Sequence, residues 1–285
     1  MNSIDIVFDN QTKIHKDRSG ISLIIFTYNQ ENFILDAIQS VFDQLCENDE
    51  LLIIDDYSQD KTINVIVDLL LSKKNIPFSC KVYTKYKNYG VNHSTNFAFE
   101  IAKNEYIVPL AGDDLYRSGA IECIKKIIPK DGYISAAFAS CDVVDEKLNV
   151  IGQTTYEDSF EVKSLIQYMK TGRFDLAGHS QVLWNTKLIR QFGPLPLDIT
   201  NEDDQLILRS VILGNVKIFS EKLRVYRRNS GSMSFANSNL FVDRKEYFLG
   251  QHTPLSNRAR NYKHFKNTII NFGIKHCLFL VKFTI

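Results

Sequence analysis

The chain has 285 residues, of which 44% are hydrophobic, and its 34 basic and 33 acidic residues leave a formal net charge of +1. This composition allows a sizeable core and gives no global reason to expect a nucleic-acid partner. The five cysteines form no Cys-x-x-Cys pair, no signal-peptide pattern follows Met1, and no apolar run approaches the roughly 18 residues of a membrane span. We therefore expect a cytoplasmic protein with reduced thiols.

Strands and helices alternate through the first 115 residues. Residues 1–19 are mostly polar and are interpreted as an N-terminal extension. After them, short apolar runs predict strands, and apolar residues at helical spacing predict helices. The alternation is typical of a parallel, doubly wound sheet. Strands are expected at 21–26, 51–56, 78–84 and 106–111, and helices at 31–45, 60–71 (capped by Ser58 or Asp60) and 92–103.

The order of elements is less regular beyond residue 115. No internal repeat and no Gly/Ser linker divides the chain, so we predict one continuous domain with two functional halves, 20–115 and 116–235. The second half is expected to contain helices at 117–128, 161–170 and 202–213, a strand at 133–141, strand and loop up to 160, and two short strands at 216–219 and 222–227.

The C-terminal tail, residues 236–285, has a distinct composition. After Glu246 it contains no acidic residue, and its Lys and Arg are interleaved with Phe, Ile and Leu. That combination suits a helix on an anionic membrane surface, which would make the protein peripheral to the inner face of the cell membrane. A helix docked on the core with a basic outer face explains the composition equally well, and the sequence leaves both interpretations open.

Two expected strands end in pairs of carboxylates, Asp55-Asp56 and Asp113-Asp114. Ligands of open α/β sheets bind beyond the carboxyl ends of the strands, and neighbouring carboxylates repel unless a cation or hydrogen-bond donors lie between them. The chain has no P-loop and no G-x-G-x-x-G, so we expect a divalent metal, Mg²⁺ or Mn²⁺, with a nucleotide. A plainer interpretation is that Asp113-Asp114 only caps the helix expected at 117–128.

Five short motifs occur in order over residues 20–235. They are Ile21-Ser22-Leu23-Ile24-Ile25-Phe26-Thr27-Tyr28-Asn29, Leu52-Ile53-Ile54-Asp55-Asp56-Tyr57-Ser58-Gln59-Asp60-Lys61-Thr62, Asn88-Tyr89-Gly90 with Ala111-Gly112-Asp113-Asp114, Asn201-Glu202-Asp203-Asp204-Gln205-Leu206, and Tyr226-Arg227-Arg228-Asn229-Ser230-Gly231-Ser232-Met233-Ser234. Their order and spacing resemble the inverting GT-A glycosyltransferases of family 2. The spore-coat-type nucleotide-sugar transferases are most similar, because they share an Ala-x-Asp-Asp variant. The resemblance implies an α/β GT-A fold, with a Rossmann-like, mostly parallel sheet flanked by helices, followed here by the C-terminal tail.

The resemblance also implies a role for each carboxylate near the nucleotide. Thr27 and Asp56 would hold the uracil and ribose of a UDP-sugar, Asp113 would contact the ribose, and Asp114 would ligate the metal on the diphosphate. The commoner Asp-x-Asp-Asp pattern has Ala111 at its first position here, which leaves open which carboxylate holds the metal. Phe26 and Asn229 also depart from the family, which usually has Pro and His there.

For the acceptor side, the resemblance implies that Glu202 and Asp203 supply the catalytic base and that His179 lies near the donor sugar and the acceptor. Helical spacing alone does not select the base, because Asp204 falls nearer the middle of the apolar arc of that helix than Asp203 does. The acids could also simply favour the positive N-terminus of the helix. The family register favours Asp203, and a carboxylate that takes the proton of the attacking hydroxyl needs no covalent intermediate.

The expected function is transfer of a single sugar from a nucleotide sugar to a saccharide or lipid-linked saccharide, in surface polysaccharide biosynthesis. The Gln-x-x-Arg-Trp signature of processive synthases is absent. One alternative is a catalytically inactive nucleotide-sugar-binding scaffold. A receiver-like signalling domain fits poorly, because Thr84-Lys85-Tyr86 follows the third strand in place of a phospho-acceptor Asp. Trp184 is interpreted as core packing rather than a platform for a sugar.

Overall fold

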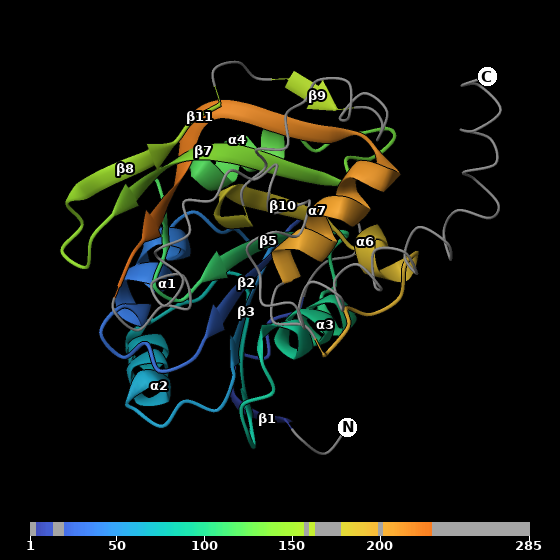
Figure 1. The fold of residues 1–285 in the computed structure, drawn as a ribbon. Coiled ribbons are helices and arrows are strands. Elements are labelled where there is room, and N and C mark those ends of the chain that lie inside the picture. Colours follow the sequence, from blue (N-terminus) through green and yellow to red (C-terminus); the bar gives the residue numbers. More distant parts are fainter. Residues whose placement is uncertain (1–3, 14–19, 157–159, 163–177, 199–201, 230–285) are drawn as a thin grey trace, which may run out of the picture.

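The computed structural model describes residues 4–13, 20–156, 160–162, 178–198 and 202–229. Within these residues the strands form one mixed sheet, and helices cover both of its faces (Figure 1). The strands are β1 (Ile4–Asp9), β2 (Ser22–Thr27), β3 (Glu50–Asp55), β4 (Ser79–Lys85), β5 (Tyr106–Ala111), β6 (Leu115–Tyr116), β7 (Ala136–Val144), β8 (Val150–Thr154), β9 (Phe160–Val162), β10 (Gln181–Asn185) and β11 (Val216–Arg227). The helices are α1 (Ile34–Phe42), α2 (Thr62–Ser72), α3 (Val91–Ile101), α4 (Ala120–Lys126), α6 (Lys187–Arg190) and α7 (Glu202–Leu213), with a 3₁₀ turn at Gly178–Ser180.

The strand order is β1-β4-β3-β2-β5-β10-β7-β11-β6, with β8 paired to β7 and β9 to β11. Strands β4, β3, β2 and β5 are parallel neighbours, as the alternation of elements predicts. Strand β10 then enters antiparallel between β5 and β7, and β7 pairs in parallel with β11. The predicted α/β class is confirmed, and the mixed half of the sheet begins where the regular alternation ends.

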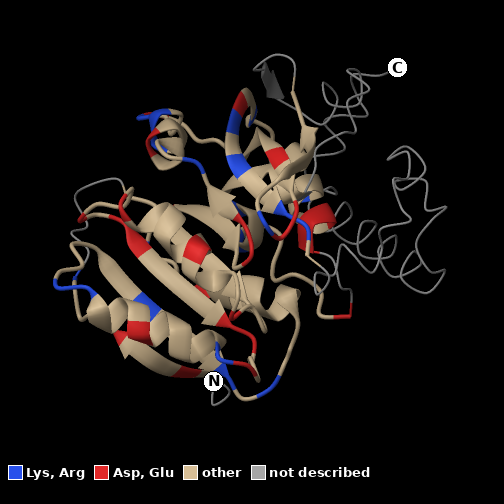
Figure 2. Cartoon of the chain, turned by 90° about the vertical axis from the view of Figure 1, so that its left-hand side faces the viewer, with Lys and Arg blue, Asp and Glu red and all other residues tan. Residues whose placement is uncertain are grey.

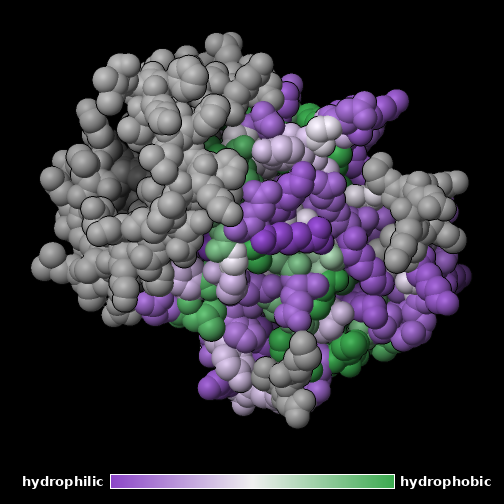
Figure 3. Space-filling model, turned by 90° about the vertical axis from the view of Figure 1, so that its right-hand side faces the viewer, coloured by the Kyte–Doolittle hydropathy of each residue, from purple (hydrophilic) through white to green (hydrophobic). Residues whose placement is uncertain are grey.

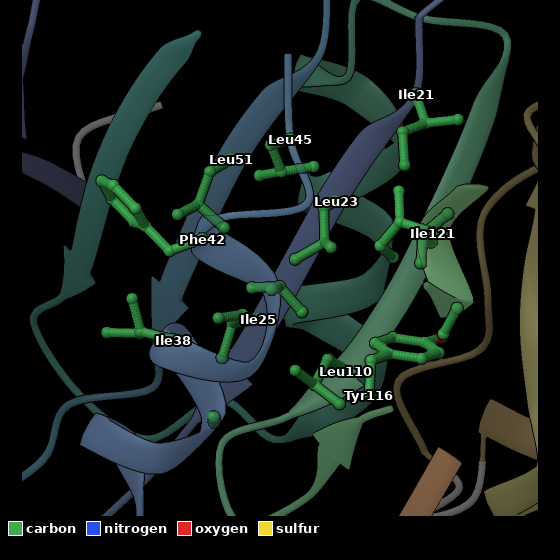
Figure 4. Close-up of a cluster of buried hydrophobic side chains, with 14 of the residues drawn as sticks. Ile21, Leu23, Ile25, Ile38, Phe42, Leu45, Leu51, Leu110, Tyr116 and Ile121 are labelled. Atoms are coloured by element: carbon green, nitrogen blue, oxygen red, sulfur yellow. The ribbon is translucent and has the colours of Figure 1, made fainter. Parts of the chain in front are cut away.

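The core lies on both faces of this sheet because side chains alternate along each strand. Leu23 and Ile25 of β2 point toward α1, α2 and α4, where they belong to the largest buried cluster (Figure 4). Ile24, between them, belongs to a second cluster with residues of α3, α6 and α7. Helix α7 also packs on β7 and β11 through Ile207 and Val211. Helix α7 therefore packs against both the parallel part and the mixed part of the sheet.

Several elements differ from the sequence-based predictions. The polar N-terminus contributes β1, an edge strand antiparallel to β4, rather than a mere extension. The two short strands expected at 216–219 and 222–227 form a single strand, β11, with breaks in register around Lys222. Strand β10 and helix α6 were not predicted. Asp60, not Ser58, accepts the first N–H of α2, from Thr62 at 2.9 Å. The helix expected at 161–170 and the tail at 236–285 lie outside the described residues, except that 160–162 form β9.

No described helix is both long enough and apolar enough to cross a membrane. Figure 2 shows basic and acidic residues interspersed over the described part of the chain. On the side where α3, α6 and α7 lie, the described surface is mostly hydrophilic, with small separate hydrophobic areas (Figure 3).

Candidate active site

Three neighbouring parallel strands end at one edge of the sheet, and backbone hydrogen bonds join their carboxyl ends. The Asp56 N–H donates to the Thr27 carbonyl at 2.9 Å, and the Gly112 N–H donates to the Phe26 carbonyl at 2.8 Å. A Cβ at Gly112 would lie 2.3 Å from Gln30 Oε1 and 3.0 Å from Thr27 Oγ1, so a larger residue there would have to displace the Gln30 side chain. Thr27, Asp56 and Gly112 with its neighbour Asp113 are thus brought together, as the sequence predicts.

The Thr27 hydroxyl is buried, and within the described residues it has no hydrogen-bond partner. Buried hydroxyls without partners are uncommon, because they lose their bonds to water without replacement. Nearby, Asn29 and Tyr57 hold left-handed backbone conformations, with φ of 52° and 73°. Such conformations are costly for residues with side chains and concentrate at ligand-binding turns. The edge formed by β2 and β3 therefore has features of a binding site.

The two acids at the end of β3 have different surroundings. Asp55 accepts hydrogen bonds from the Tyr57 and Ser58 backbone N–H groups and from the Thr84 hydroxyl, so it stabilises the turn that follows β3. Asp56 accepts from Lys85 Nζ at 2.8 Å, and from two successive backbone N–H groups of the loop before α3, at 3.0 and 2.7 Å. These bonds use about three of the four acceptor positions of a carboxylate. One position of Asp56 is left for a ligand.

Lys85 is a functional residue that the sequence analysis missed. Its side chain is fully buried and also donates to Ser94 at 2.6 Å, so α3 and Asp56 share one ammonium group. Burial lowers the pKa of Lys85, while the hydrogen bond to Asp56 opposes that change. Lys85 is the last residue of a strand that packs within the sheet. Its partnership with an acid could have been predicted, since a buried cation requires an acidic partner.

The two acids after β5 also differ. Asp114 is buried; it pairs with Arg224 Nη2 at 2.8 Å and accepts the Arg227 backbone N–H at 2.9 Å, so both of its oxygens are engaged. Asp113 accepts from Asn229 Nδ2 at 2.7 Å. All three partners come from β11 or from the residues just after it, more than 100 positions away in the chain. The segment that resembles the family's closing motif therefore closes over the end of β5.

Burial raises the pKa of both acids. For Asp113 the Asn229 amide opposes the rise. For Asp114 burial raises the pKa to about 7, although the Arg224 guanidinium favours the charged form. The assignment of the metal to Asp114 remains a prediction, and these contacts do not favour it, because a metal would have to replace the existing partners of that carboxylate.

Helix α7 begins at Glu202, so Glu202 and Asp203 lie in its first turn. Asp203 Oδ1 accepts a hydrogen bond from Gln181 Nε2 at 2.8 Å. The pKa of Glu202 is raised well above its usual value by burial and then by the negative charge of Asp203 beside it. Arg224 counteracts that rise, so one guanidinium influences both the acids of α7 and the acid after β5.

His179 lies in the 3₁₀ turn just before β10. Its ring stacks on Tyr226 of β11 with centroids 4.6 Å apart, and its Nε2 is 2.7 Å from Thr154 Oγ1. Tyr226 follows Arg224 by two residues, and His179 precedes Gln181 by two. His179 is therefore held next to the residues that join Asp114 to Asp203.

The predicted site residues are connected to one another through residues that were not predicted. Arg224 links Asp114 to the Gln181 carbonyl at 3.0 Å, and the Gln181 side chain contacts Asp203. Neither residue carried a clear signal in the sequence, because Arg224 lies in a segment with several other charged side chains and Gln181 is neutral. Within the described residues there is no group of three or more His, Cys, Asp or Glu side chains arranged to hold a metal ion.

Known structures with this arrangement of strands and helices define the class of protein. Staphylococcus aureus TarS in complex with UDP-GlcNAc matches with a TM-score of 0.61 at 16% identity, over 90% of this chain and 74% of that one. The mannosyltransferase PcManGT of Pyrobaculum calidifontis, in complex with GDP-Man and Mn²⁺, matches with a TM-score of 0.55 at 16% identity, over 83% of this chain and 64% of that one. The fold is GT-A, as predicted.

The family model described as glycosyl transferase family 2 matches residues 22–191, more than half of the chain, and the chain belongs to this family. Glycosyltransferase GlyG of Streptococcus pneumoniae is 22% identical over 75% of this chain and 72% of its own length. An Escherichia coli UDP-Gal:alpha-D-GlcNAc-diphosphoundecaprenol beta-1,3-galactosyltransferase is 26% identical over 40% of each chain. A Haemophilus influenzae glycosyltransferase is 28% identical over 45% of this chain, and the chain spans only 38% of that relative.

Proposed function

We propose that this chain transfers a single sugar from a UDP-sugar to a saccharide or lipid-linked saccharide acceptor, with inversion at the anomeric carbon. The observation that carries the proposal is the continuous series of contacts from Asp114 through Arg224 and Gln181 to Asp203. These contacts support the proposal, because they connect the candidate nucleotide site with the candidate base. TarS, which binds UDP-GlcNAc, and the E. coli galactosyltransferase, named for a diphosphoundecaprenol acceptor, support the choice of donor and acceptor classes.

Thr27 and Asp56 are proposed to hold the nucleoside. The unpartnered Thr27 hydroxyl offers a donor and acceptor to the base, and Asp56 retains acceptor capacity beside it. Lys85 and the backbone N–H groups that bind Asp56 fix its position before any ligand arrives. A group held in place in advance binds with a smaller loss of conformational freedom.

A divalent metal fits the acids after β5, through Asp113 rather than Asp114. Magnesium and manganese sites for nucleotides need only one or two carboxylates, because phosphate oxygens and water complete the shell. Asp113 accepts a side-chain hydrogen bond from the neutral Asn229, whereas Asp114 is bound to a guanidinium. When bound, such a metal would stabilise the charge of the departing diphosphate.

Asp203 is proposed as the general base. It would accept the proton of the acceptor hydroxyl while that oxygen attacks the anomeric carbon from the side opposite the diphosphate, in a single displacement. For Glu202 beside it, burial and the Asp203 charge raise the pKa and so favour the neutral form. His179, stacked on Tyr226, would border the donor sugar and the acceptor.

Asp203→Asn tests the function and the base together. We expect the variant to bind nucleotide as the parent does, but to lose about 10²–10⁴-fold in turnover, because the amide cannot accept the proton. The donor is chosen beforehand from UDP-glucose, UDP-galactose and their N-acetyl forms, as the one that most raises the melting temperature with Mn²⁺. Turnover is then measured as UDP released with water as the acceptor.

Asp204→Asn is the matched control, since it removes the same charge one residue further along α7. Loss of turnover in Asp204→Asn with a normal Asp203→Asn variant would assign the base to Asp204. A parent protein that binds the donor and releases no UDP would favour the nucleotide-sugar-binding scaffold over an enzyme.

A further inference from the structure

Strand β10 contains a bulge where it meets the candidate site. Gln181 pairs with Phe138 of β7, but Leu183 pairs with Ala137, so β10 has one residue more than its partner. Val182 and Leu183, although consecutive, both belong to the cluster on the α1 and α4 side of the sheet. Bulges of this kind redirect side chains and are frequent beside active sites.

The bulge puts Gln181 and Trp184 on the same face. Two strand residues three apart would ordinarily point to opposite faces. Here the Trp184 indole Nε1 donates to Gln181 Oε1 at 2.7 Å, on the side where α3 and α7 pack. Because indole nitrogen is only a donor, it must meet the amide oxygen, and this fixes the amide in one orientation. The amide NH₂ group then points to Asp203 Oδ1 at 2.8 Å.

Trp184 is itself held firmly. Its ring stacks on Phe99 of α3, with ring centroids 5.8 Å apart. The ring of Phe26 of β2 also lies beside it, with centroids 6.3 Å apart. Only 3% of its surface is exposed, which confirms its interpretation as core packing. The Gln181 backbone is held as well, because its carbonyl accepts from Arg224, the partner of Asp114. Trp184 therefore fixes the side chain of Gln181, and Arg224 fixes its backbone carbonyl.

We propose that Gln181 is a positioning residue. Trp184 and Arg224 hold it in place, and its side-chain amide in turn orients the carboxylate of Asp203. The inference rests on the proposed function, in which Asp203 is the base. The Gln181 amide orients one carboxylate oxygen through a hydrogen bond that favours the charged form of Asp203. Trp184 prevents the amide from turning its oxygen toward that carboxylate, where the two would repel.

Gln181→Met removes both amide hydrogen bonds and keeps nearly the same volume. We expect kcat for UDP release from the selected UDP-sugar to fall by roughly 10- to 100-fold with KM little changed, since misplacement of a reacting group by about 1 Å has effects of that size. Trp184→Phe keeps an aromatic ring without the N–H and should lower kcat less. In the Gln181→Met background, Trp184→Phe should lower kcat no further, because its effect acts through the amide.

Asn185→Leu is the matched control. Asn185 lies on the same strand, is fully buried, and donates a comparable amide hydrogen bond to Glu105 at 3.1 Å, away from α7. It should lower the melting temperature as Gln181→Met does and leave kcat near that of the parent. A Gln181→Met variant with the same kcat as Asn185→Leu overturns the inference.

The hydrogen bonds can also be observed without turnover, because Trp184 is the single tryptophan of the chain and gives one indole N–H resonance. In Gln181→Met we expect this resonance to move upfield and its proton to exchange faster with solvent. In Asp203→Leu, which removes the acceptor of the Gln181 amide, it should move in the same direction, and in Asn185→Leu it should not. An indole resonance insensitive to Asp203→Leu overturns the inference.

The two proposals fail in different ways. A parent protein that binds the donor and releases no UDP removes the proposed function. Full turnover in Asp203→Asn removes the base role of Asp203, and with it the positioning role of Gln181, but leaves sugar transfer in place. Loss of turnover in Asp203→Asn together with parent-like kinetics in Gln181→Met removes only the positioning role and leaves the proposed function in place.

Discussion

The two adjacent aspartates after β5 have different surroundings. Asp114 binds a buried guanidinium and a backbone N–H, whereas Asp113 binds a neutral amide. Removing one partner of a buried ion pair leaves the other charge uncompensated, which is costly. Asp114 is therefore expected to matter for stability, and Asp113 for the metal.

Asn substitutions at the two positions should separate these effects. Asp114→Asn should lower the free energy of unfolding by about 3 kcal/mol or more, because it leaves Arg224 without its counter-charge. Asp113→Asn should unfold nearly as the parent does and lose the part of UDP binding that depends on Mn²⁺. Urea titration measures the first effect, and calorimetry of UDP binding with and without Mn²⁺ measures the second. Loss of the Mn²⁺ dependence in a stable Asp114→Asn protein would instead restore Asp114 as the metal ligand.

At the scale of elements, β11 holds the mixed half of the sheet to the site. It pairs in parallel with β7 and antiparallel with β6, and it supplies Arg224, Tyr226 and Arg227 to the surroundings of the acids. Asp142 of β7, which lies in register with Val225 of β11, strengthens this connection, because it forms ion pairs with Lys222 of β11 and with Arg117 just after β6. One carboxylate thus joins three strands.

The stability contributed by Asp142 should depend on pH. Burial opposes its ionisation, but hydrogen bonds from Lys222 and Arg117 outweigh that effect, so its pKa is lowered below the ordinary value of 3.8. A lowered pKa contributes stability above the unfolded value, and this is lost as the pH falls through the folded value. Asp142→Asn should therefore lower the free energy of unfolding by about 1–2 kcal/mol at pH 7.

The same comparison at lower pH provides the control. As the pH falls below 3.8, the ordinary pKa of an aspartate, and through the lowered pKa of the folded state, parent and Asp142→Asn should approach each other in stability, as urea titrations at several pH values would measure. A difference that stays constant from neutral to acidic pH would mean that the substitution acts through packing and not through charge.

At the scale of the whole molecule, the described surface mixes charges of both signs and has only small hydrophobic areas on the face of α3, α6 and α7 (Figures 2 and 3). The basic and aromatic sequence of residues 236–285 is the remaining support for a membrane partner, and we propose that this tail binds an anionic lipid surface. Such a location would suit an acceptor attached to a lipid, like the one in the name of the E. coli relative.

Sedimentation with vesicles tests that proposal. The full chain should sediment with vesicles containing phosphatidylglycerol, less so at raised salt, and a chain ending near residue 240 should remain in the supernatant, because the basic residues after Glu246 would be missing. Vesicles of phosphatidylcholine alone serve as the control. Equal recovery of both chains in the supernatant would rule out attachment through the tail.

The sequence by itself determined the parallel half of the fold and the acids at its strand ends. Continuous apolar runs such as Leu51–Ile54, and apolar residues at helical spacing such as Ile34 and Ile38, record local preferences that need no knowledge of distant residues. Strands of that kind end at a common edge, so Thr27, Asp56 and Asp113 could be placed together in advance.

Only the tertiary structure decided which acids have partners and which residues hold them. Arg224 meets Asp114 across 110 positions, and Gln181 meets Asp203 across 22, through a bulge that no local pattern records. Strand β10 enters antiparallel, and β1 adds an edge to the sheet, because backbone groups of distant segments pair there. Periodicity reports which side of an element is apolar; the particular partner of a buried charge depends on how those elements pack.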